Sequence, residues 1–568
     1  MTEENMTIEE RPWLASYPQG IPEQIDPDQY RSIAAMLEEC CDRFRQRPAF
    51  VNMGRRISFD DLNRLSARFA AFLINDLNLV KGDRVALMLP NVLQYPILLM
   101  AVLRAGLTVV NVNPLYTARE LKHQLDDSGA SAIVVLDNFA HTVAEVIANV
   151  PCKHVICTGV GDLLGFPKGA ITNFVVRYIK KMVPPYSIPN AIRFNAALAR
   201  GARSHFEKVE IGPDDIAFLQ YTGGTTGIAK GAMLTHRNMV ANMLQAHAWI
   251  GLNIRQGKEV IITALPLYHI FALTANFLVF TRVGGLNHLI TNPRDMSAFV
   301  REIRSIGFTV LPGVNTLFAG LMNTPGFDQV DFSRLHLAFG GGMAVQRAVA
   351  ERWKKMTGCS LLEAYGLTET APAACINPLD TVDYNGSIGL PIPSTDVSIH
   401  GDDGKPLKFG EVGELCIRGP QVMKGYWHRP EETAKVLTAD GWLHTGDLAY
   451  MDEKGFVYIV DRKKDMILVS GFNVYPNEIE DVVAQLDGIA EVAAVGVPDE
   501  KAGEIVKLVV VRKDANLTEE AIFEHCKKNL TGYKRPKYIE FRRSLPKTNV
   551  GKILRRELRQ TPTPDTRA

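Results

Sequence analysis

The chain has 568 residues, of which 46% are hydrophobic and 22% are charged, and its formal net charge at pH 7 is +1. This length exceeds what one hydrophobic core supports, so several subdomains are expected. A net charge near zero without a long basic run argues against a general nucleic-acid binder. The eight cysteines form no C-x-x-C pair, so no zinc or thioredoxin-like motif is indicated, and we expect packing cysteines in a reducing compartment.

Two further features of the sequence concern a secretory signal and a membrane-spanning segment. The N-terminal stretch MTEENMTIEERPW is acidic and has no apolar core segment, so we expect no secretory signal. The longest apolar run, Ile270 to Phe280, is too short to span a bilayer. These features predict a cytoplasmic enzyme.

The first part of the chain alternates between helix and strand patterns. Ser58 with Asp61 and Thr117 with Glu120 form capping boxes, which predict one helix running through Ile74 and a second one after Thr117. Residues 91–106 predict a helix, and the apolar runs at 84–89, 108–112 and 132–137 predict strands. Such alternation is typical of mainly parallel sheets covered by helices, so the expected fold class is α/β.

The stretch from Gly165 to Asn190 mixes apolar and basic side chains. One interpretation is an amphipathic helix that lies on an anionic membrane surface. The other, more usual interpretation is a surface helix docked on its own domain. The sequence leaves both open.

The pattern changes near residue 460. Residues 478–486 and the stretch after the N-cap candidate Thr518 predict helices, and residues 492–497, 505–511 and 538–541 predict strands. This pattern is typical of a small α+β domain. We therefore expect an N-terminal tail at 1–30, a large N-terminal domain of helix-covered sheets at 31–463, and a small C-terminal lid domain from Lys464, at 464–568.

The glycine-rich stretch YTGGTTGIAKG, Tyr221 to Gly231, lies between two strand patterns, at residues 216–222 and 230–235. A Walker A loop needs a lysine after the last glycine and a helix directly behind it. Here Lys230 precedes Gly231, so an ordinary P-loop NTPase is disfavoured. Glycines nevertheless let backbone N–H groups point inward, and Thr222, Thr225, Thr226 and Lys230 add donors and charge. The loop is a candidate phosphate site, although a mobile turn is the plainer alternative.

Three further segments carry groups suited to a nucleotide. In EAYGLTET, which is expected to be a short loop, Tyr365 suits stacking on a base, Thr368 suits a phosphate oxygen and Glu369 suits a magnesium ion. GWLHTGD ends at Asp447, whose carboxylate suits both hydroxyls of a ribose. Arg462, in DRKKD, offers a fork for ribose or phosphate oxygens. Each segment alone has an ordinary structural explanation, and their combination favours a nucleotide site.

The motifs YTGGTTGIAKG, YGLTE, GWLHTGD and PKTNVGK occur in the order and spacing of the adenylate-forming acyl-CoA ligases. The chain resembles this family from about residue 30 to about residue 560, and its region from Asp440 to Glu480 resembles the signature of the fatty acyl-CoA synthetases, closest to the bacterial long-chain branch. The resemblance implies ATP-dependent ligation of a long-chain fatty acid to coenzyme A through an acyl-adenylate, with release of AMP and pyrophosphate. It also implies ATP, Mg2+ and coenzyme A as cofactor and co-substrates.

Residue roles follow from the resemblance. The loop Thr222, Gly223, Gly224, Thr225, Thr226, Gly227 and Lys230 would close over the β- and γ-phosphates. Gly340, Gly341 and Gly342 with Tyr365 and Gly366 would hold the adenine, and Asp447 with Arg462 would hold the ribose. Thr368 would contact the α-phosphate, Glu369 and Thr225 the magnesium, and Lys552 would bridge the carboxylate and the α-phosphate.

A second set of roles concerns the acid and the thioester step. His269 would lie near the fatty carboxylate, although a lone histidine in an apolar run is often a satisfied core residue. Lys464 would be the hinge of a mobile C-terminal domain, whose rotation would bring Gly471, Phe472 and Asn473 to the pantetheine path.

Alternatives to long-chain fatty acid activation remain at this point. They are a medium-chain or aryl-acid ligase of the same family, a P-loop phosphotransferase, and a non-catalytic lipid-binding protein. The fatty acid is the expected partner and nucleic acid is not. Peripheral association with the inner face of the cell membrane and a homodimer are further expectations.

Overall fold

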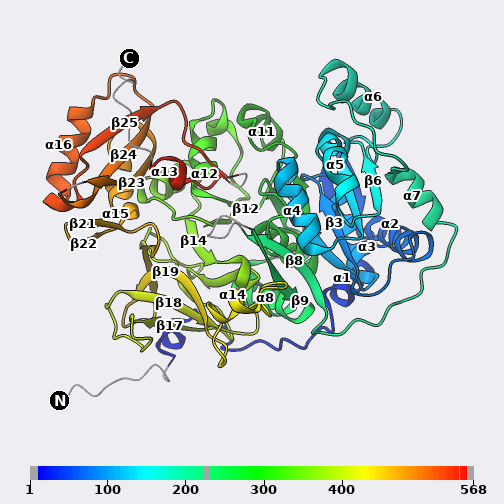
Figure 1. The fold of residues 1–568 in the computed structure, drawn as a ribbon, viewed down its shortest axis with the longest axis horizontal. Coiled ribbons are helices and arrows are strands. Elements are labelled where there is room, and N and C mark those ends of the chain that lie inside the picture. Colours follow the sequence, from blue (N-terminus) through cyan, green and yellow to red (C-terminus); the bar gives the residue numbers. More distant parts are fainter. Residues whose placement is uncertain (1–10, 223–228, 500, 549–550, 560–568) are drawn as a thin grey trace.

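The computed structural model describes residues 11–222, 229–499, 501–548 and 551–559. These residues form four sheets with helices around them (Figure 1). Three sheets belong to the large N-terminal part of the chain, and the fourth belongs to a smaller C-terminal part at the left of the view. The predicted α/β class with a small α+β C-terminal domain is confirmed.

The first sheet has seven strands in the order β7-β6-β5-β3-β4-β8-β9, parallel except for the final β8/β9 pair. Its strands are β3 (Arg84–Met88), β4 (Thr108–Asn111), β5 (Ala132–Leu136), β6 (His154–Thr158), β7 (Ile192–Arg193), β8 (Ile216–Thr222) and β9 (Lys230–Thr235). The helices nearest to it in sequence are α2 (Phe59–Ala71), α3 (Gln94–Arg104), α4 (Ala118–Ser128), α5 (Ala140–Val146), α6 (Lys168–Phe174), α7 (Phe194–Gly201) and α8 (His236–Ile250).

The second sheet has nine strands in the order β16-β15-β14-β13-β12-β10-β11-β1-β2, with a parallel centre and antiparallel edges. Its strands are β1 (Pro48–Asn52), β2 (Arg55–Ser58), β10 (Val260–Thr263), β11 (Leu286–Leu289), β12 (Val310–Gly313), β13 (Leu337–Gly341), β14 (Leu361–Gly366), β15 (Ala373–Ile376) and β16 (Leu390–Pro391). The helices here are α1 (Ile33–Arg43), α9 (Ile270–Ala272), α10 (Val279–Arg282), α11 (Met296–Ile303), α12 (Asn315–Asn323) and α13 (Arg347–Thr357).

The third sheet is antiparallel, with the order β17-β18-β19-β20. It contains β17 (Asp396–His400), β18 (Gly413–Arg418), β19 (Leu443–Met451) and β20 (Val457–Arg462), with α14 (Pro430–Ala434) between the second and third strands. The C-terminal sheet contains β21 (Ile467–Val469), β22 (Phe472–Val474), β23 (Ile489–Asp499), β24 (Gly503–Arg512) and β25 (Tyr538–Arg542), with α15 (Pro476–Ala484) and α16 (Glu519–Asn529).

Local sequence signals explain where the helices begin. Both predicted capping boxes are present: the Ser58 side chain accepts from the Asp61 N–H at the start of α2, and Thr117 accepts from Glu120 at the start of α4. The predicted N-cap of the last helix, α16, is also present, since the Thr518 side chain accepts from the N–H three residues further on. These side chains satisfy N–H groups that have no partner within the helix.

Residues 11–30, within the predicted tail, pack on the body of the protein. Trp13 is buried, the Tyr17 hydroxyl donates to the Pro391 carbonyl at 2.6 Å, and Arg11 pairs with Asp396 at 2.8 Å. Among the described residues, no helix combines the length and apolar content that a membrane crossing requires.

Candidate active site

The end of β14 meets the β19/β20 hairpin in a cluster of three predicted site residues. The Tyr365 hydroxyl donates to Asp447 Oδ2 at 2.6 Å, and Arg462 Nε lies 3.4 Å from Asp447 Oδ1. Strand pairing places Asp447 directly opposite Arg462. The carboxylate is buried, with 5% of the residue exposed, and burial raises the pKa of Tyr365, so this hydroxyl stays protonated as a donor.

Tyr365 is part of a strand, which corrects the expectation of a short loop from Glu363 to Thr370. The loop begins only after Gly366, where the chain turns into the 3-10 segment Thr368–Thr370. A Cβ on Gly366 would lie 1.8 Å from the Pro372 carbonyl oxygen, so only glycine permits this turn. Sheet pairing with β13 and β15 outweighs the loop-like composition of the motif.

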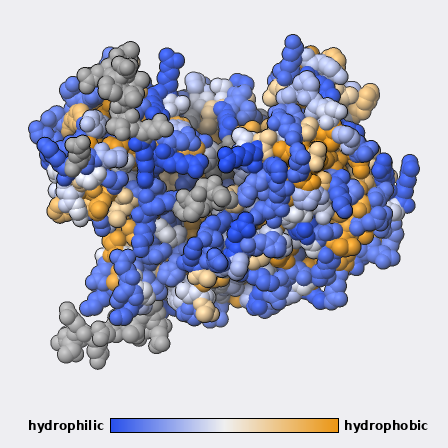
Figure 2. All heavy atoms as spheres, viewed as in Figure 1, coloured by the Kyte–Doolittle hydropathy of each residue, from blue (hydrophilic) through white to orange (hydrophobic). Residues whose placement is uncertain are grey.

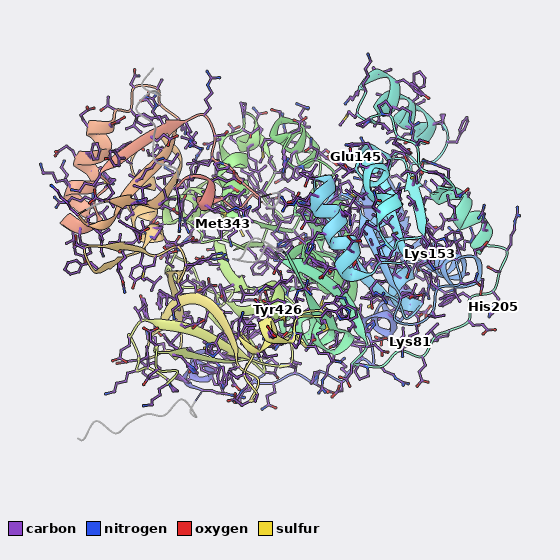
Figure 3. All side chains as sticks on the ribbon, viewed as in Figure 1. Lys81, Glu145, Lys153, His205, Met343 and Tyr426 are labelled. Carbon is purple, nitrogen blue, oxygen red and sulfur yellow. The ribbon has the colours of Figure 1, made fainter. Side chains whose placement is uncertain are left out.

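Glu369 is held by a partner that the sequence does not reveal. The Tyr426 hydroxyl donates to Glu369 Oε1 at 2.7 Å, and the Glu369 carbonyl accepts from the Met423 N–H at 2.8 Å. Tyr426 is labelled near the centre of the molecule in Figure 3. It lies in a segment without a recognisable motif, and only the tertiary structure identifies it.

Lys230 follows the glycine-rich stretch and lies at the start of β9, opposite Thr222 at the end of β8. The two strands on either side of the glycine-rich stretch are as predicted. The Lys230 ammonium pairs with Glu432 of α14 and lies 5.2 Å from the centre of the Tyr426 ring. Gly223, Gly224, Thr225, Thr226 and Gly227 lie outside the described residues.

Gly340 and Gly341 end β13, and Gly342 follows with a φ of +76°. A Cβ on Gly340 would lie 2.3 Å from a Val345 methyl group, and one on Gly341 would lie 3.0 Å from the Ala364 carbonyl oxygen. The segment therefore packs closely beside β14, one residue from Tyr365. The three glycines and Tyr365 therefore lie at the carboxyl ends of the adjacent strands β13 and β14.

Lys552 reaches this cluster from the C-terminal domain on a tight turn. The Thr548 N–H donates to the Lys552 carbonyl at 2.7 Å, and the Lys552 N–H donates to Thr548 Oγ1 at 3.1 Å. The turn contacts the N-terminal domain where Thr316 Oγ1 donates to the Gly551 carbonyl at 3.2 Å.

Burial and charge both act on this lysine. Burial, followed by repulsion from Arg462, lowers the pKa of Lys552 from 10.5 to about 7. Burial, followed by the charge of Lys552, lowers the pKa of His269 from 6.5 to about 4, so this histidine is neutral near pH 7. Lys552 thus interacts electrostatically with Arg462, Asp447 and His269, groups that are far apart in the sequence.

The predicted hinge residue lies between the third sheet and the C-terminal sheet, and the predicted CoA-binding residues lie in the C-terminal sheet. Lys464 lies between β20 and β21, at the passage from the third sheet to the C-terminal sheet. Gly471, Phe472 and Asn473 are exposed at the hairpin of β21 and the edge strand β22, and Phe472 stacks on Tyr533 with ring centres 4.7 Å apart. Lys552, in contrast, interacts electrostatically with Asp447.

Among the described residues, one group of side chains combines metal-ligand types at short distances: His400, Cys416 and His444 of the third sheet. Cys416 Sγ lies 3.4 Å from His444 Nδ1. Sulfur and imidazole ligands suit zinc-like ions and not magnesium, which prefers oxygen. The group is therefore no candidate for the predicted magnesium site, for which the sequence predicts the Glu369 carboxylate as a ligand.

Comparison with known proteins assigns the chain to a family. Residues 37–427 match the AMP-binding enzyme family, and residues 478–552 match the AMP-binding enzyme C-terminal domain. The chain therefore belongs to the AMP-binding enzymes.

Individual relatives are similar over nearly their whole length. The chain is 59% identical to a long-chain-fatty-acid–CoA ligase of Escherichia coli O157:H7 over 547 residues, which cover 96% of this chain and 97% of that protein. It is 39% identical to a long-chain-fatty-acid–CoA ligase of Bacillus subtilis (strain 168), with 98% of each chain covered. Among solved structures, ATP-bound MatB from Rhodopseudomonas palustris superimposes with a TM-score of 0.78 at 29% identity, covering 93% of this chain and 98% of that one.

Proposed function

We propose that this protein joins a long-chain fatty acid to coenzyme A at the expense of ATP, in two half-reactions at one site. The fatty carboxylate attacks the α-phosphate of ATP, which gives acyl-adenylate and pyrophosphate. The CoA thiol then attacks the acyl carbon and AMP leaves. The first step is needed because a free carboxylate has no acceptable leaving group, whereas the adenylate has AMP.

The first half-reaction brings two anions together, so the site must supply cations and donors where charge develops. Lys552 and Arg462 supply the cations, and Lys552 would bridge the carboxylate and the α-phosphate. The observation that carries the proposal is that Lys552, on a turn of the C-terminal domain that contacts Thr316 of the N-terminal domain, interacts electrostatically with Asp447, Arg462 and His269.

The nucleotide would be held by groups from both N-terminal sheets. Asp447, oriented by Tyr365 and Arg462, would accept from the ribose hydroxyls, and the edge formed by Gly340–Gly342 and Tyr365 would hold the adenine. Thr222, Lys230 and the loop between them would surround the β- and γ-phosphates, and Thr368 the α-phosphate. Magnesium, held by Glu369 together with Thr225, would neutralise phosphate charge.

The thioester step would need a different face of the C-terminal domain. We propose that rotation about Lys464 withdraws Lys552 and brings the hairpin of Gly471, Phe472 and Asn473 to the site. Its exposure in the present arrangement fits a surface that engages only after rotation. Peripheral contact with a membrane and a homodimer belong to the same proposal.

The function is tested by incubating the pure protein with ATP, CoA and a panel of acids. We expect AMP and pyrophosphate, not ADP, with turnover highest for long-chain acids. Highest turnover with medium-chain or aryl acids would assign a different acid, and ADP release would overturn the proposal.

The role of Lys552 is tested by separating the half-reactions. We expect Lys552→Ala to lose acid-dependent pyrophosphate exchange by a factor of about 100 or more, since a bridging charge is removed. Thioester formation from preformed acyl-AMP should be largely retained. Equal loss in both half-reactions would contradict a role confined to the first one.

A further inference from the structure

The segment around α6 projects from the first sheet at the upper right of Figure 1. It extends from Phe166 to Met182 and contains α6 and the following π-helical turn Val175–Ile179. Six of the large apolar side chains that are exposed among the described residues are concentrated here, each more than half exposed. We call these residues the apolar tip: Phe166, Ile171, Phe174, Tyr178, Ile179 and Met182.

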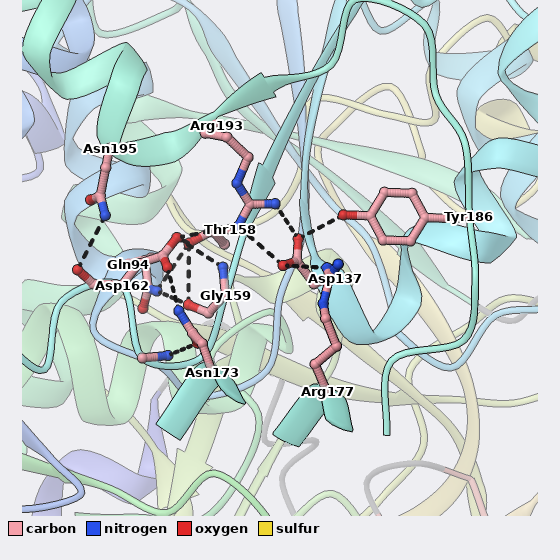
Figure 4. Close-up of polar contacts among 11 residues, drawn as sticks. Gln94, Asp137, Thr158, Gly159, Asp162, Asn173, Arg177, Tyr186, Arg193 and Asn195 are labelled. Atoms are coloured by element: carbon pink, nitrogen blue, oxygen red, sulfur yellow. Dashed lines mark hydrogen bonds and ion pairs between the residues drawn. The ribbon is translucent and has the colours of Figure 1, made fainter. Parts of the chain in front are cut away.

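The helix turns its polar face toward the protein. Asn173 Oδ1 accepts from the Gly161 N–H at 2.7 Å and its Nδ2 donates to Asp162 Oδ1 at 2.9 Å, and Arg177, one turn further on, pairs with Asp137 at 3.3 Å (Figure 4). Three apolar residues of the tip, Ile171, Phe174 and Tyr178, recur at helical spacing and are exposed. A helix docked on its own domain would normally bury such an apolar face. This helix is docked, but through polar contacts, and its apolar face is left exposed.

The base of the segment fixes this orientation. Buried Asp137 accepts from both terminal nitrogens of Arg193, at 2.7 and 3.0 Å, and from the Tyr186 hydroxyl at 3.0 Å (Figure 4). A Cβ on Gly161 would lie 2.2 Å from the Gly169 carbonyl oxygen, so two glycines bring α6 into backbone contact with the loop after β6. The network and this close packing prevent the helix from rolling its apolar face inward.

The charge of the segment has one sign. From Gly165 to Asn190 there are four cations, Lys168, Arg177, Lys180 and Lys181, and no aspartate or glutamate. Lys180 and Lys181 are exposed, and no carboxylate of the described residues pairs with them. Figure 2 shows pale and orange spheres beside blue ones over this projection.

We propose that the apolar tip, with Lys180 and Lys181, is a docking surface for an anionic phospholipid bilayer. The apolar side chains would enter the boundary between headgroups and acyl chains, and the lysines would contact the phosphates. A second copy of this chain is a poorer occupant, because two such tips would bring four exposed lysines together, Lys180 and Lys181 of each copy, with no carboxylate in either segment from Gly165 to Asn190. The inference rests on the proposed function only for its purpose, which is access to a substrate that partitions into membranes.

The test is sedimentation of the full-length protein with vesicles at 0.15 M salt. One vesicle set contains phosphatidylglycerol and phosphatidylethanolamine, and the other contains phosphatidylcholine alone. We expect binding at least tenfold tighter to the anionic set. The triple variant Ile171→Ser, Phe174→Ser, Ile179→Ser and the double variant Lys180→Glu, Lys181→Glu should each lose at least tenfold of it.

Matched controls carry the same changes elsewhere. Val80, Leu252 and Val382 are exposed apolar residues outside the segment, and Lys527 and Lys528 are exposed on α16. Val80→Ser, Leu252→Ser, Val382→Ser and Lys527→Glu, Lys528→Glu should bind within twofold of the parent. Unchanged thermal unfolding of all variants establishes that they are folded.

Three outcomes would overturn the inference. They are undiminished vesicle binding by both tip variants, equal binding to both vesicle sets, and a dimer in solution that only the apolar-tip variant converts to a monomer. The last outcome would assign the face to contacts between copies. Failure of the proposed function is read separately, as absence of AMP release by the parent protein with any acid, and does not affect the sedimentation result.

Discussion

Lys552 is the residue whose surroundings are most unusual. Three cations, Arg462, Lys464 and Arg555, act on it, opposed by the carboxylate of Asp447. Because burial lowers its pKa to about 7, the lysine is only about half charged at neutral pH without nucleotide. A bound triphosphate would supply the missing negative charge and raise this pKa again.

This residue-scale argument predicts proton uptake on binding. At pH 8, binding of Mg-ATP should take up roughly one proton at Lys552, and the affinity for ATP should fall as the pH rises from 7 to 9. Calorimetric titrations in buffers of different ionisation enthalpy measure this uptake. In Lys552→Met the uptake should disappear, and an unchanged uptake would show that another group binds the proton.

At the scale of elements, the connection between β20 and β21 joins the two domains. The Lys463 N–H donates to the Gly446 carbonyl at 3.0 Å, which ties this connection to the residue before Asp447. The Lys464 N–H makes no hydrogen bond to any described residue, and the Lys464 carbonyl accepts from Arg559 at 3.2 Å. A proline at position 463 would therefore remove a backbone hydrogen bond, whereas a proline at position 464 would not.

Proline substitutions use this difference. Lys464→Pro restricts φ at the proposed hinge without removing a hydrogen bond, so it should slow the thioester step about tenfold or more and leave adenylation nearly intact. Lys463→Pro removes the bond to Gly446 and should impair adenylation as well. Single-turnover measurements of both half-reactions check this, and an unaffected second step in Lys464→Pro would argue against a hinge there.

At the scale of the whole molecule, Arg555 connects the C-terminal domain to the third sheet. It donates to Glu480 at 2.8 Å and lies 3.7 Å from buried Asp461, whose own pKa burial raises to about 6. In the same arrangement Lys552 is half-buried, and burial lowers its pKa. Closure therefore carries a free-energy cost, because the charged form of Lys552 loses hydration when the two domains come together.

The balance between closed and open arrangements should depend on pH. The pKa of Lys552 is about 7 when enclosed and 10.5 in its ordinary state, so the closed arrangement gains stability as the pH rises from 7 toward 10.5, by at most about 1.4 kcal/mol per pH unit. Asp461 and His269 titrate below this window. Small-angle scattering without ligands should give a more compact protein at pH 9 than at pH 7, while Lys552→Met should be insensitive. A parent protein that is insensitive to pH, or a variant with the same response, would contradict this.

Much of the fold was predictable because it depends on short-range signals. Capping boxes at Ser58 and Thr117, strand runs such as residues 84–89, and the two strands that flank the glycine-rich stretch need only neighbouring residues. The helix at α6 was predicted as a helix, but the direction of its apolar face was not. That direction depends on Asp137, Gly161 and Asp162, which belong to other elements.

The sequence by itself determined the family motifs, the helix-covered sheets and the identity of most residues in the cluster, since each is encoded in a contiguous stretch. Only the tertiary structure decided which of them meet. Tyr365 and Asp447 are 82 residues apart, and Glu369 and Tyr426 are 57 apart. Such contacts are set by strand order and by how the C-terminal domain docks, and burial there, not local sequence, gives Lys552 its lowered pKa.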